Sequence, residues 1–176
     1  MSGADDATRR LEQQVAEAQK GPGGQGKGPP PLTSFDLVLH HDGAWTHEGE
    51  PFRNNRLREK FDRSVRYLPA EQAYVVQIGR FRGLIDVEEA GFFVRSLDPG
   101  LGTMELSDGA DEELDVASLR PSGRDGALLC QVKCELAPGG LPARFSHAAQ
   151  AEFMNAVCED GRFVVLGGEK IPLPEI

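Results

Sequence analysis

The sequence predicts one α+β domain, with a largely antiparallel sheet and two short amphipathic helices. Many short runs rich in Val, Ile and aromatic residues are separated by Gly, Pro or Asp turns, which is typical of strands. Two stretches place apolar residues at the i, i+4 spacing of a helix. Strands and helices do not alternate as a parallel doubly wound sheet requires. At 176 residues and 39% hydrophobic content, the chain is long enough for one core.

Residues 1–34 are expected to form a disordered arm ahead of this domain. Residues 7–20 can form a marginal helix with Leu11 and Val15 on one side, but the segment is otherwise charged and rich in Gln. Nine of the eleven residues in 21–31 are Gly or Pro, as in a linker. The globular domain is therefore expected to span residues 35–176.

The domain begins with a predicted hairpin and helix. Residues 35–39 and 44–47 are strand-like and flank a turn in which Gly43 takes the positive-φ position. Asn54 or Asn55 can cap a helix that runs to about residue 62, and Leu57 and Phe61 then share its inner face.

A strand-rich stretch and a second helix follow. Ser146 can cap a helix over residues 148–158, and two strands, residues 163–166 and 170–173, close the chain. Both halves combine strands with one short helix, which leaves room for a cryptic duplication. The strands expected between the helices form an antiparallel meander over residues 74–78, 84–87, 92–97, 103–106, 113–116 and 127–134.

Charge and hydropathy narrow the classes of partner. The 28 acidic and 19 basic residues give a net charge of −9, which makes nucleic acid an unlikely partner. No stretch approaches the roughly 18 apolar residues of a membrane helix. The first residues lack the features of a secretory signal, so we expect a cytoplasmic protein without membrane contact.

Cysteine usage agrees with a reducing compartment, because three cysteines are too few for a secreted disulfide framework. All three lie in apolar runs, where thiols are expected to be buried, unreactive and raised in pKa. These residues are Cys130, Cys134 and Cys158.

The first helix carries a basic stripe. Its four cationic residues fall within roughly 80 degrees at the helical step of 100 degrees per residue. Such an edge can bind a small anionic ligand or an acidic protein partner, because Arg matches carboxylate and phosphate groups. The alternative is a solvated face or internal pairing, since residues 86–115 hold ten acidic side chains. The stripe consists of Arg53, Arg56, Lys60 and Arg63.

Arg80 and Arg82 flank Phe81 in a glycine-bounded segment that is expected to be a hairpin tip. This composition can stack on a base or clamp a phosphate. The alternative is a turn whose Phe81 folds back onto the core.

The densest group of potential metal ligands lies in the first hairpin and comprises His40, His41 and His47. They suggest a small metal-dependent hydrolase as a rival hypothesis. The spacing argues against it, because neighbours such as His40 and His41 should point to opposite faces of a strand.

No catalytic motif is evident. The chain has no Gly-x-Ser-x-Gly elbow, no phosphate-binding Gly-Lys-Ser/Thr loop and no Gly-x-Gly-x-x-Gly after a strand. We therefore predict no catalytic residues and no cofactor, and we do not expect an enzyme.

Two patterns carry a family resemblance. The first is Asp42-Gly43-x-Trp45 with Gly49-x-Pro51-Phe52, followed by Leu57 and Phe61; the second is Tyr74-Val75-Val76 with Ile85-Asp86-Val87-Glu88-Glu89, closing on Phe92 and Phe93. Together they resemble the proteobacterial domain-of-unknown-function family 1285, over residues 36–95 and more loosely 143–157. The resemblance implies a mixed α+β fold built from two similar motifs, with ligand-binding or signalling roles and no established catalytic residues.

The leading hypothesis is thus a binding or regulatory module that recognises a small anionic ligand or a protein partner through the basic stripe. A third hypothesis is a structural interaction protein whose residues 7–20 fold as a helix on a partner through Leu11 and Val15.

Overall fold

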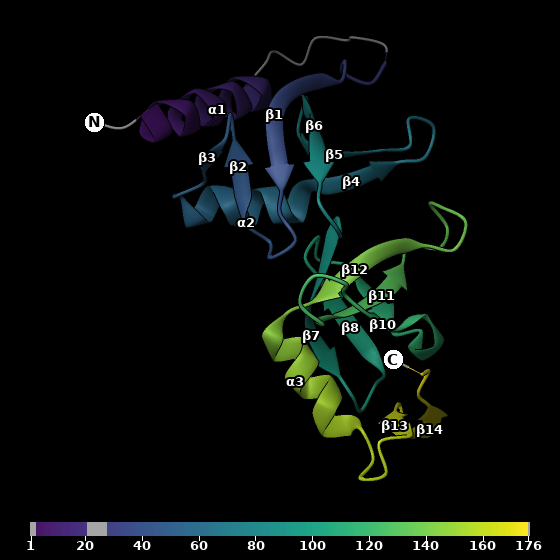
Figure 1. The fold of residues 1–176 in the computed structure, drawn as a ribbon. Helices are drawn as coiled ribbons and strands as arrows, with labels where there is room; N and C mark the ends of the chain where they lie inside the picture. Colours follow the sequence, from purple (N-terminus) through teal and green to yellow (C-terminus); the bar gives the residue numbers. More distant parts are fainter. Residues whose placement is uncertain (1–2, 21–27, 176) are drawn as a thin grey trace. The chain divides into compact units, whose positions relative to one another are not determined.

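The computed structural model describes residues 3–20 and 28–175, and it confirms the predicted α+β class. The chain divides into two compact units, Met1–Glu89 and Ala90–Ile176. Each unit is built around its own six-stranded sheet (Figure 1). The sequence predicted a single globular unit starting at residue 35. The structure has two units instead, because each sheet packs on a hydrophobic core of its own.

The first unit contains two helices and one sheet with the strand order β3-β2-β1-β6-β5-β4. Strands β1 and β6 pair in parallel, and the other neighbours pair antiparallel. The elements are α1 (Gly3–Lys20), β1 (Thr33–Leu39), β2 (Trp45–His47), β3 (Glu50–Pro51), α2 (Asn55–Ser64), β4 (Val65–Leu68), β5 (Ala73–Ile78) and β6 (Phe81–Val87).

The second unit has a sheet with the order β10-β11-β12-β7-β8-β9, in which β12 and β7 are the parallel pair. A separate hairpin, β13 with β14, ends the chain. The elements are β7 (Phe92–Asp98), β8 (Thr103–Leu106), β9 (Asp111–Glu113), the 3-10 helix η1 (Val116–Ser118), β10 (Arg120–Pro121), β11 (Leu128–Val132), β12 (Leu141–Phe145), α3 (His147–Ala156), β13 (Phe163–Leu166) and β14 (Glu169–Pro172).

The two sheets share one topology, which confirms the duplicated motif. Each consists of a three-stranded meander, a helical connection and a second three-stranded meander. In each, the first strand of the first meander pairs in parallel with the last strand of the second. The connection is α2 in the first unit and the short η1 in the second, where the larger helix α3 follows the sheet instead.

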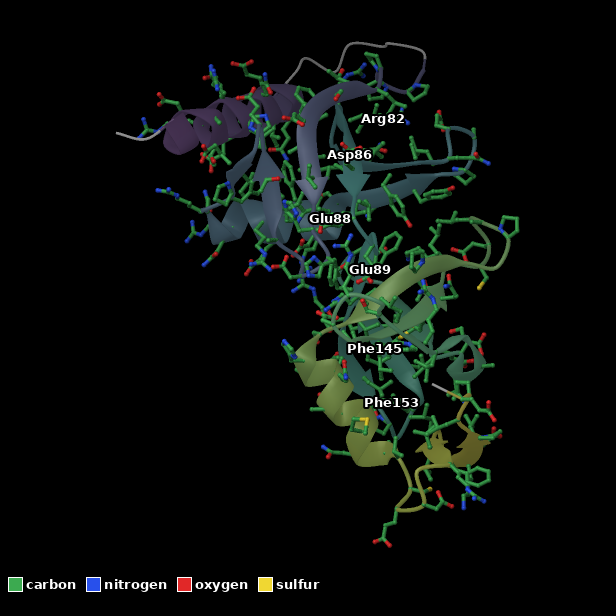
Figure 2. All side chains as sticks on the ribbon, in the orientation of Figure 1. Arg82, Asp86, Glu88, Glu89, Phe145 and Phe153 are labelled. Atoms are coloured by element: carbon green, nitrogen blue, oxygen red, sulfur yellow. The ribbon has the colours of Figure 1, made fainter. Side chains whose placement is uncertain are left out.

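The two cores differ in composition. In the first unit Phe61 is fully buried and packs edge-on against Trp45 at 5.5 Å between ring centroids and against Phe52 at 5.1 Å. The Trp45 indole N–H donates to Asp62 at 2.8 Å, which satisfies its buried polar atom. In the second unit Phe153 of α3 packs on Phe145 of β12 at 6.0 Å between ring centroids (Figure 2), and most of the other buried side chains of this unit are aliphatic.

Both helix caps and the hairpin turn follow the predictions. The Asn54 side chain accepts the backbone N–H groups of Arg56 and Leu57, and Ser146 accepts that of Ala149. Gly43 has a φ of 83° in the turn before β2. Side-chain acceptors at the N-cap explain why both helices begin where the sequence indicates.

Two strand predictions and one helix end need correction. Residues 84–87 and 92–97 do not pair with each other, because β6 and β7 belong to different sheets. Residues 113–116 are not a strand; β9 ends at Glu113 and η1 begins at Val116. Val157 lies beyond α3 and bridges to Val164, since its extended backbone serves the last hairpin. Short strands such as β3 and β10 carry too little periodicity to be recognised.

The arm prediction also differs from the structure, because α1 is a helix of the first unit. Ala7, Leu11 and Val15 follow the i, i+4, i+8 spacing and are buried. This narrow stripe is enough for docking, since tertiary packing of one face stabilises most helices. The predicted linker falls mainly on residues 21–27, which lie outside the described residues. With Leu11 and Val15 occupied inside the unit, partner-induced folding through them loses its basis.

The cysteines are all free, and one of the three matches the predicted environment. Cys130 is buried, and burial raises the pKa of its thiol to about 12. Cys134 is exposed and Cys158 is half-buried, so the expectation of burial was wrong for both. Cys134 follows β11, where the chain has left the core.

Candidate functional site

The groove between α1 and α2 of the first unit is the candidate site. It has a volume of about 220 Å³. Helix α2 contributes Arg56, Leu57 and Lys60, because these residues follow the i, i+4 spacing on the side facing α1. The α1 side is formed by Glu12, Val15, Ala16 and Gln19.

A second hollow of about 270 Å³ adjoins this groove at the start of α2. Arg9 and Arg53 line it, and the two hollows share Glu12 and Asn54. The Asn54 amide donates to the Glu12 carboxylate at 2.5 Å, so the N-cap residue also ties α1 to α2. We call the two hollows together the basic groove.

Within the part of the chain whose side chains the structure describes, no ion pair neutralises the cations of the basic groove. Arg9, Arg53, Arg56 and Lys60 make no ion pair with any side chain of residues 6–19 and 28–175. The groove's one carboxylate, Glu12, already accepts a hydrogen bond from Asn54. Four cations around one acidic group leave a local positive potential in an acidic protein.

The structure separates the four residues of the predicted stripe. Arg56 and Lys60 line the first hollow and Arg53 the second, whereas Arg63 is exposed near the end of α2 and lines neither. Arg53 precedes the N-cap Asn54, so the helical angle assigned to it does not apply. The alternative of ion pairing with residues 86–115 is not observed for these four side chains.

The Arg80 to Arg82 segment does not form an exposed aromatic clamp. Phe81 begins β6, is buried, and stacks on Phe35 at 4.8 Å between centroids. Arg82 is only 9% exposed and donates to the Pro30 carbonyl at 2.8 Å. Arg80 alone lies exposed in the turn. The alternative, in which Phe81 folds onto the core, is correct.

His40 and His41 both bind Glu88, contrary to the prediction that they point apart. Nδ1 of His40 lies 2.8 Å from one Glu88 oxygen, and Nδ1 of His41 lies 3.1 Å from the other. The two histidines lie in the turn after β1 and not in a strand, so strand alternation does not apply. The His41 backbone N–H and then both imidazoles hold the pKa of Glu88 down at about 2.

His47 lies apart from this pair, on the buried face of β2. Among residues 3–20 and 28–175, no group of three or more His, Cys, Asp or Glu side chains is arranged to hold a metal ion. Nothing in the described chain therefore favours the metal-dependent hydrolase.

Sequence reasoning missed Arg9, Glu12 and Asn54 as members of the basic groove. The first two lie on α1, which was assigned to the arm, and Asn54 was recognised only as a cap. The signal was available in the spacing of Ala7, Leu11 and Val15, which marks the face of α1 that docks.

The fold and the groove together define a duplicated α+β protein with a cationic surface site. Its structure is similar to that of a DUF1285 family protein from Silicibacter pomeroyi, with 18% sequence identity, a TM-score of 0.57, and coverage of 90% of this chain and 93% of that chain. A DUF1285 family protein from Shewanella baltica is also similar, with 15% identity, a TM-score of 0.45, and coverage of 68% and 91%. The predicted resemblance is thus confirmed as a likeness of fold.

Two other comparisons find nothing: no model of a known protein family matches the chain, and no curated protein does. Within the described residues, no helix is long and apolar enough to cross a membrane.

Proposed function

We propose that this protein is a non-catalytic module that binds a small anionic ligand in the basic groove. The observation that carries the proposal is the set of four cations, Arg9, Arg53, Arg56 and Lys60, which surround two adjoining hollows without ion-pair partners among the described residues. Burying such cations against a carboxylate or phosphate forms charge-assisted hydrogen bonds, which are about twice as strong as neutral ones.

The size of the groove favours a small ligand. Its hollows, of about 220 and 270 Å³, each lie below the roughly 300–1,000 Å³ of pockets for drug-sized molecules. The net charge of −9 repels long polyanions, whereas a small anion senses mainly the local field. No Cys, His or Ser lines either hollow, and the one lining hydroxyl, Thr8, makes no hydrogen bond with Glu12, so no nucleophile is paired with a base there.

The test is a calorimetric titration of the full-length protein with inorganic phosphate, citrate and nucleoside monophosphates. The Arg56→Glu, Lys60→Glu double variant should lose at least tenfold in affinity, because each lost charged hydrogen bond costs roughly 1.5–3 kcal/mol. Removing two exposed or half-exposed cations should leave the fold intact, which far-ultraviolet circular dichroism will check.

The matched control is the Arg58→Glu, Arg120→Glu double variant, which changes net charge equally. Arg58 lies on α2 about 200 degrees from Arg56, and Arg120 lies in the second unit; both are exposed. This variant should bind as the wild type does. If both double variants weaken binding equally, the effect is one of net charge. Unchanged affinity in Arg56→Glu, Lys60→Glu would contradict the proposal.

An acidic protein partner is the other class of anion that the groove could meet. A peptide rich in Asp and Glu, added to the same series of titrations, would reveal it, because the peptide would then bind while the small anions would not. The cytoplasmic location stays a prediction.

A further inference from the structure

A separate hollow of about 360 Å³ lies on the first unit where β1, β2 and α1 meet. Its polar walls come from three places in the sequence: Arg10 and Gln14 of α1, Ser34 and Asp36 of β1, and His47 with Glu48 at the end of β2. It shares no lining residue with the basic groove.

The hollow lies at an irregularity in β1. Against β6, Ser34 and Leu37 pair with the consecutive residues Leu84 and Ile85, so two residues, Phe35 and Asp36, bulge out of the ladder. Asp36 has a φ of 52°, and its carbonyl accepts the Glu48 backbone N–H at 3.0 Å. Bulges re-aim side chains and are frequent beside binding sites. The bulge in β1 brings Asp36 next to the turn that follows β2, which begins at Glu48.

His47 is a buried polar side chain without a partner. It is 4% exposed, and its Nδ1 makes no hydrogen bond within the described structure. An unsatisfied buried nitrogen costs folding free energy, so its presence calls for an explanation. His47 lines the hollow, so a ligand bound there that forms a hydrogen bond with the imidazole would explain the unpaired nitrogen.

The charges around the hollow have both signs. Arg10 and Glu48 form an ion pair at 2.9 Å, but their side chains are 64% and 50% exposed. Such a solvated pair contributes little and can exchange partners. Asp36 of β1 adds a second carboxylate to the lining of the hollow.

We propose that this hollow binds a small zwitterion, a free α-amino acid. Its carboxylate replaces Glu48 as the partner of Arg10, whose guanidinium matches a carboxylate with two parallel hydrogen bonds. Its ammonium group lies against Asp36 and the released Glu48. The imidazole of His47 and the amide of Gln14 then meet its backbone or side-chain polar atoms. Both charged groups of the amino acid then pair with opposite charges of the hollow, whereas a simple anion or a simple amine can form only one of these two pairs.

The experiment is a set of two-dimensional NMR titrations of the full-length protein with each of the twenty free amino acids up to millimolar concentrations. At least one should shift resonances of the β1 bulge and the β2 turn in a saturable way. For the best binder, the N-acetyl derivative and the amide each lack one charge. Each should bind about tenfold more weakly or worse, as the loss of a charged hydrogen bond implies.

Two conservative variants keep the test independent of folding. His47→Leu removes the unpartnered nitrogen and should fold at least as stably, and Asp36→Asn keeps a residue type that tolerates a positive φ. Both should weaken amino acid binding about tenfold or more and leave phosphate binding at the basic groove unchanged. Arg56→Glu, Lys60→Glu should do the reverse, so the two sites fail separately.

Three outcomes would overturn the zwitterion site: no saturable shift with any amino acid, equal binding of the amide or N-acetyl derivative, or His47→Leu and Asp36→Asn variants that bind as tightly as the wild type. Shifts confined to residues of α2 would also overturn it, because they would place the amino acid in the basic groove.

Discussion

The two units have the same sheet topology but treat the irregularity of their first strand differently. In the second unit, β7 departs from regular pairing with β8 between Val94 and Ser96, and the Leu97 N–H that follows donates to Glu152 of α3 at 2.7 Å. In the first unit, the bulge of β1 at Phe35 and Asp36 borders a hollow of about 360 Å³.

The position of the helix in each half explains this difference. Helix α3 follows β12 directly and packs along β7, so its Glu152 carboxylate accepts the N–H of Leu97 just after the irregularity. In the first unit α2 connects the two meanders and α1 precedes them, and the groove between these helices and the hollow at β1 both stay open. A duplicated scaffold can thus place a helix against the irregular first strand in one copy and leave a hollow beside that strand in the other.

The largest expected effect compares the two helix anchors. Phe61→Ala and Phe153→Ala each remove a fully buried ring, which typically costs about 3–5 kcal/mol of unfolding free energy. Phe61→Ala should cost more, because Phe61 also touches the rings of Trp45, Phe52 and Phe81. Urea unfolding measured by circular dichroism provides the comparison.

Trp45 supplies an independent fluorescence signal, because it is the chain's single tryptophan and its ring centroid lies 5.5 Å from that of Phe61. Its fluorescence should change in Phe61→Ala at zero denaturant and stay as in the wild type in Phe153→Ala. A greater loss of stability in Phe153→Ala would show that the aromatic core is not the stronger of the two.

Much of the fold could be predicted because local signals decide it. Asn54 and Ser146 mark helix starts by their capping chemistry, and Gly43 marks a turn by its φ. The split into two sheets could not be predicted, because β6 and β7 read as successive strands of one meander. Pairing partners are set by long-range packing, which residue periodicity does not encode.

The next effect compares the irregularity of β7, beside the Glu152 hydrogen bond, with the bulge of β1. Glu152→Ala leaves the Leu97 N–H without its charged acceptor and should cost about 1.5–3 kcal/mol of unfolding free energy. Glu152→Gln, whose amide oxygen can still accept, should cost less. Asp36→Asn should be nearly neutral, because the exposed Asp36 carboxylate has no hydrogen bond or ion pair with another described residue.

Chemical denaturation of the three variants measures this order. A cost for Asp36→Asn as large as that for Glu152→Ala would mean that the β1 bulge is held by its side chain, as the β7 irregularity is. The hollow beside β1 would then be a structural feature and not an open site.

The candidate sites were only partly predictable. Arg56 and Lys60 were found because helical spacing places them on one face, whereas the α1 half of the groove was missed with the helix itself. His47 was named as a metal ligand, yet its distinguishing property is burial without a partner. Burial of a single polar residue in an alternating strand depends on which elements cover that face, and sequence spacing gives no access to that.

The smallest effect concerns the carboxylate that joins the turn after β1 to the end of β6. The His41 backbone N–H, His40 and His41 lower the pKa of Glu88 from 4.5 to about 2. Because the pKa of Glu88 is lower in the folded state, its ionised carboxylate stabilises the fold at pH values above the unfolded pKa of 4.5. This contribution is lost as pH falls from about 4.5 toward 2.

Glu88→Gln should therefore be less stable than the wild type at neutral pH, and the difference should shrink steadily below about pH 4.5. Urea midpoints measured across that range will show it, with Glu50→Gln, an exposed carboxylate of β3, as the control that should not reproduce the pattern. A difference between Glu88→Gln and wild type that stays constant with pH would mean that the Glu88 carboxylate is not what holds the two histidines.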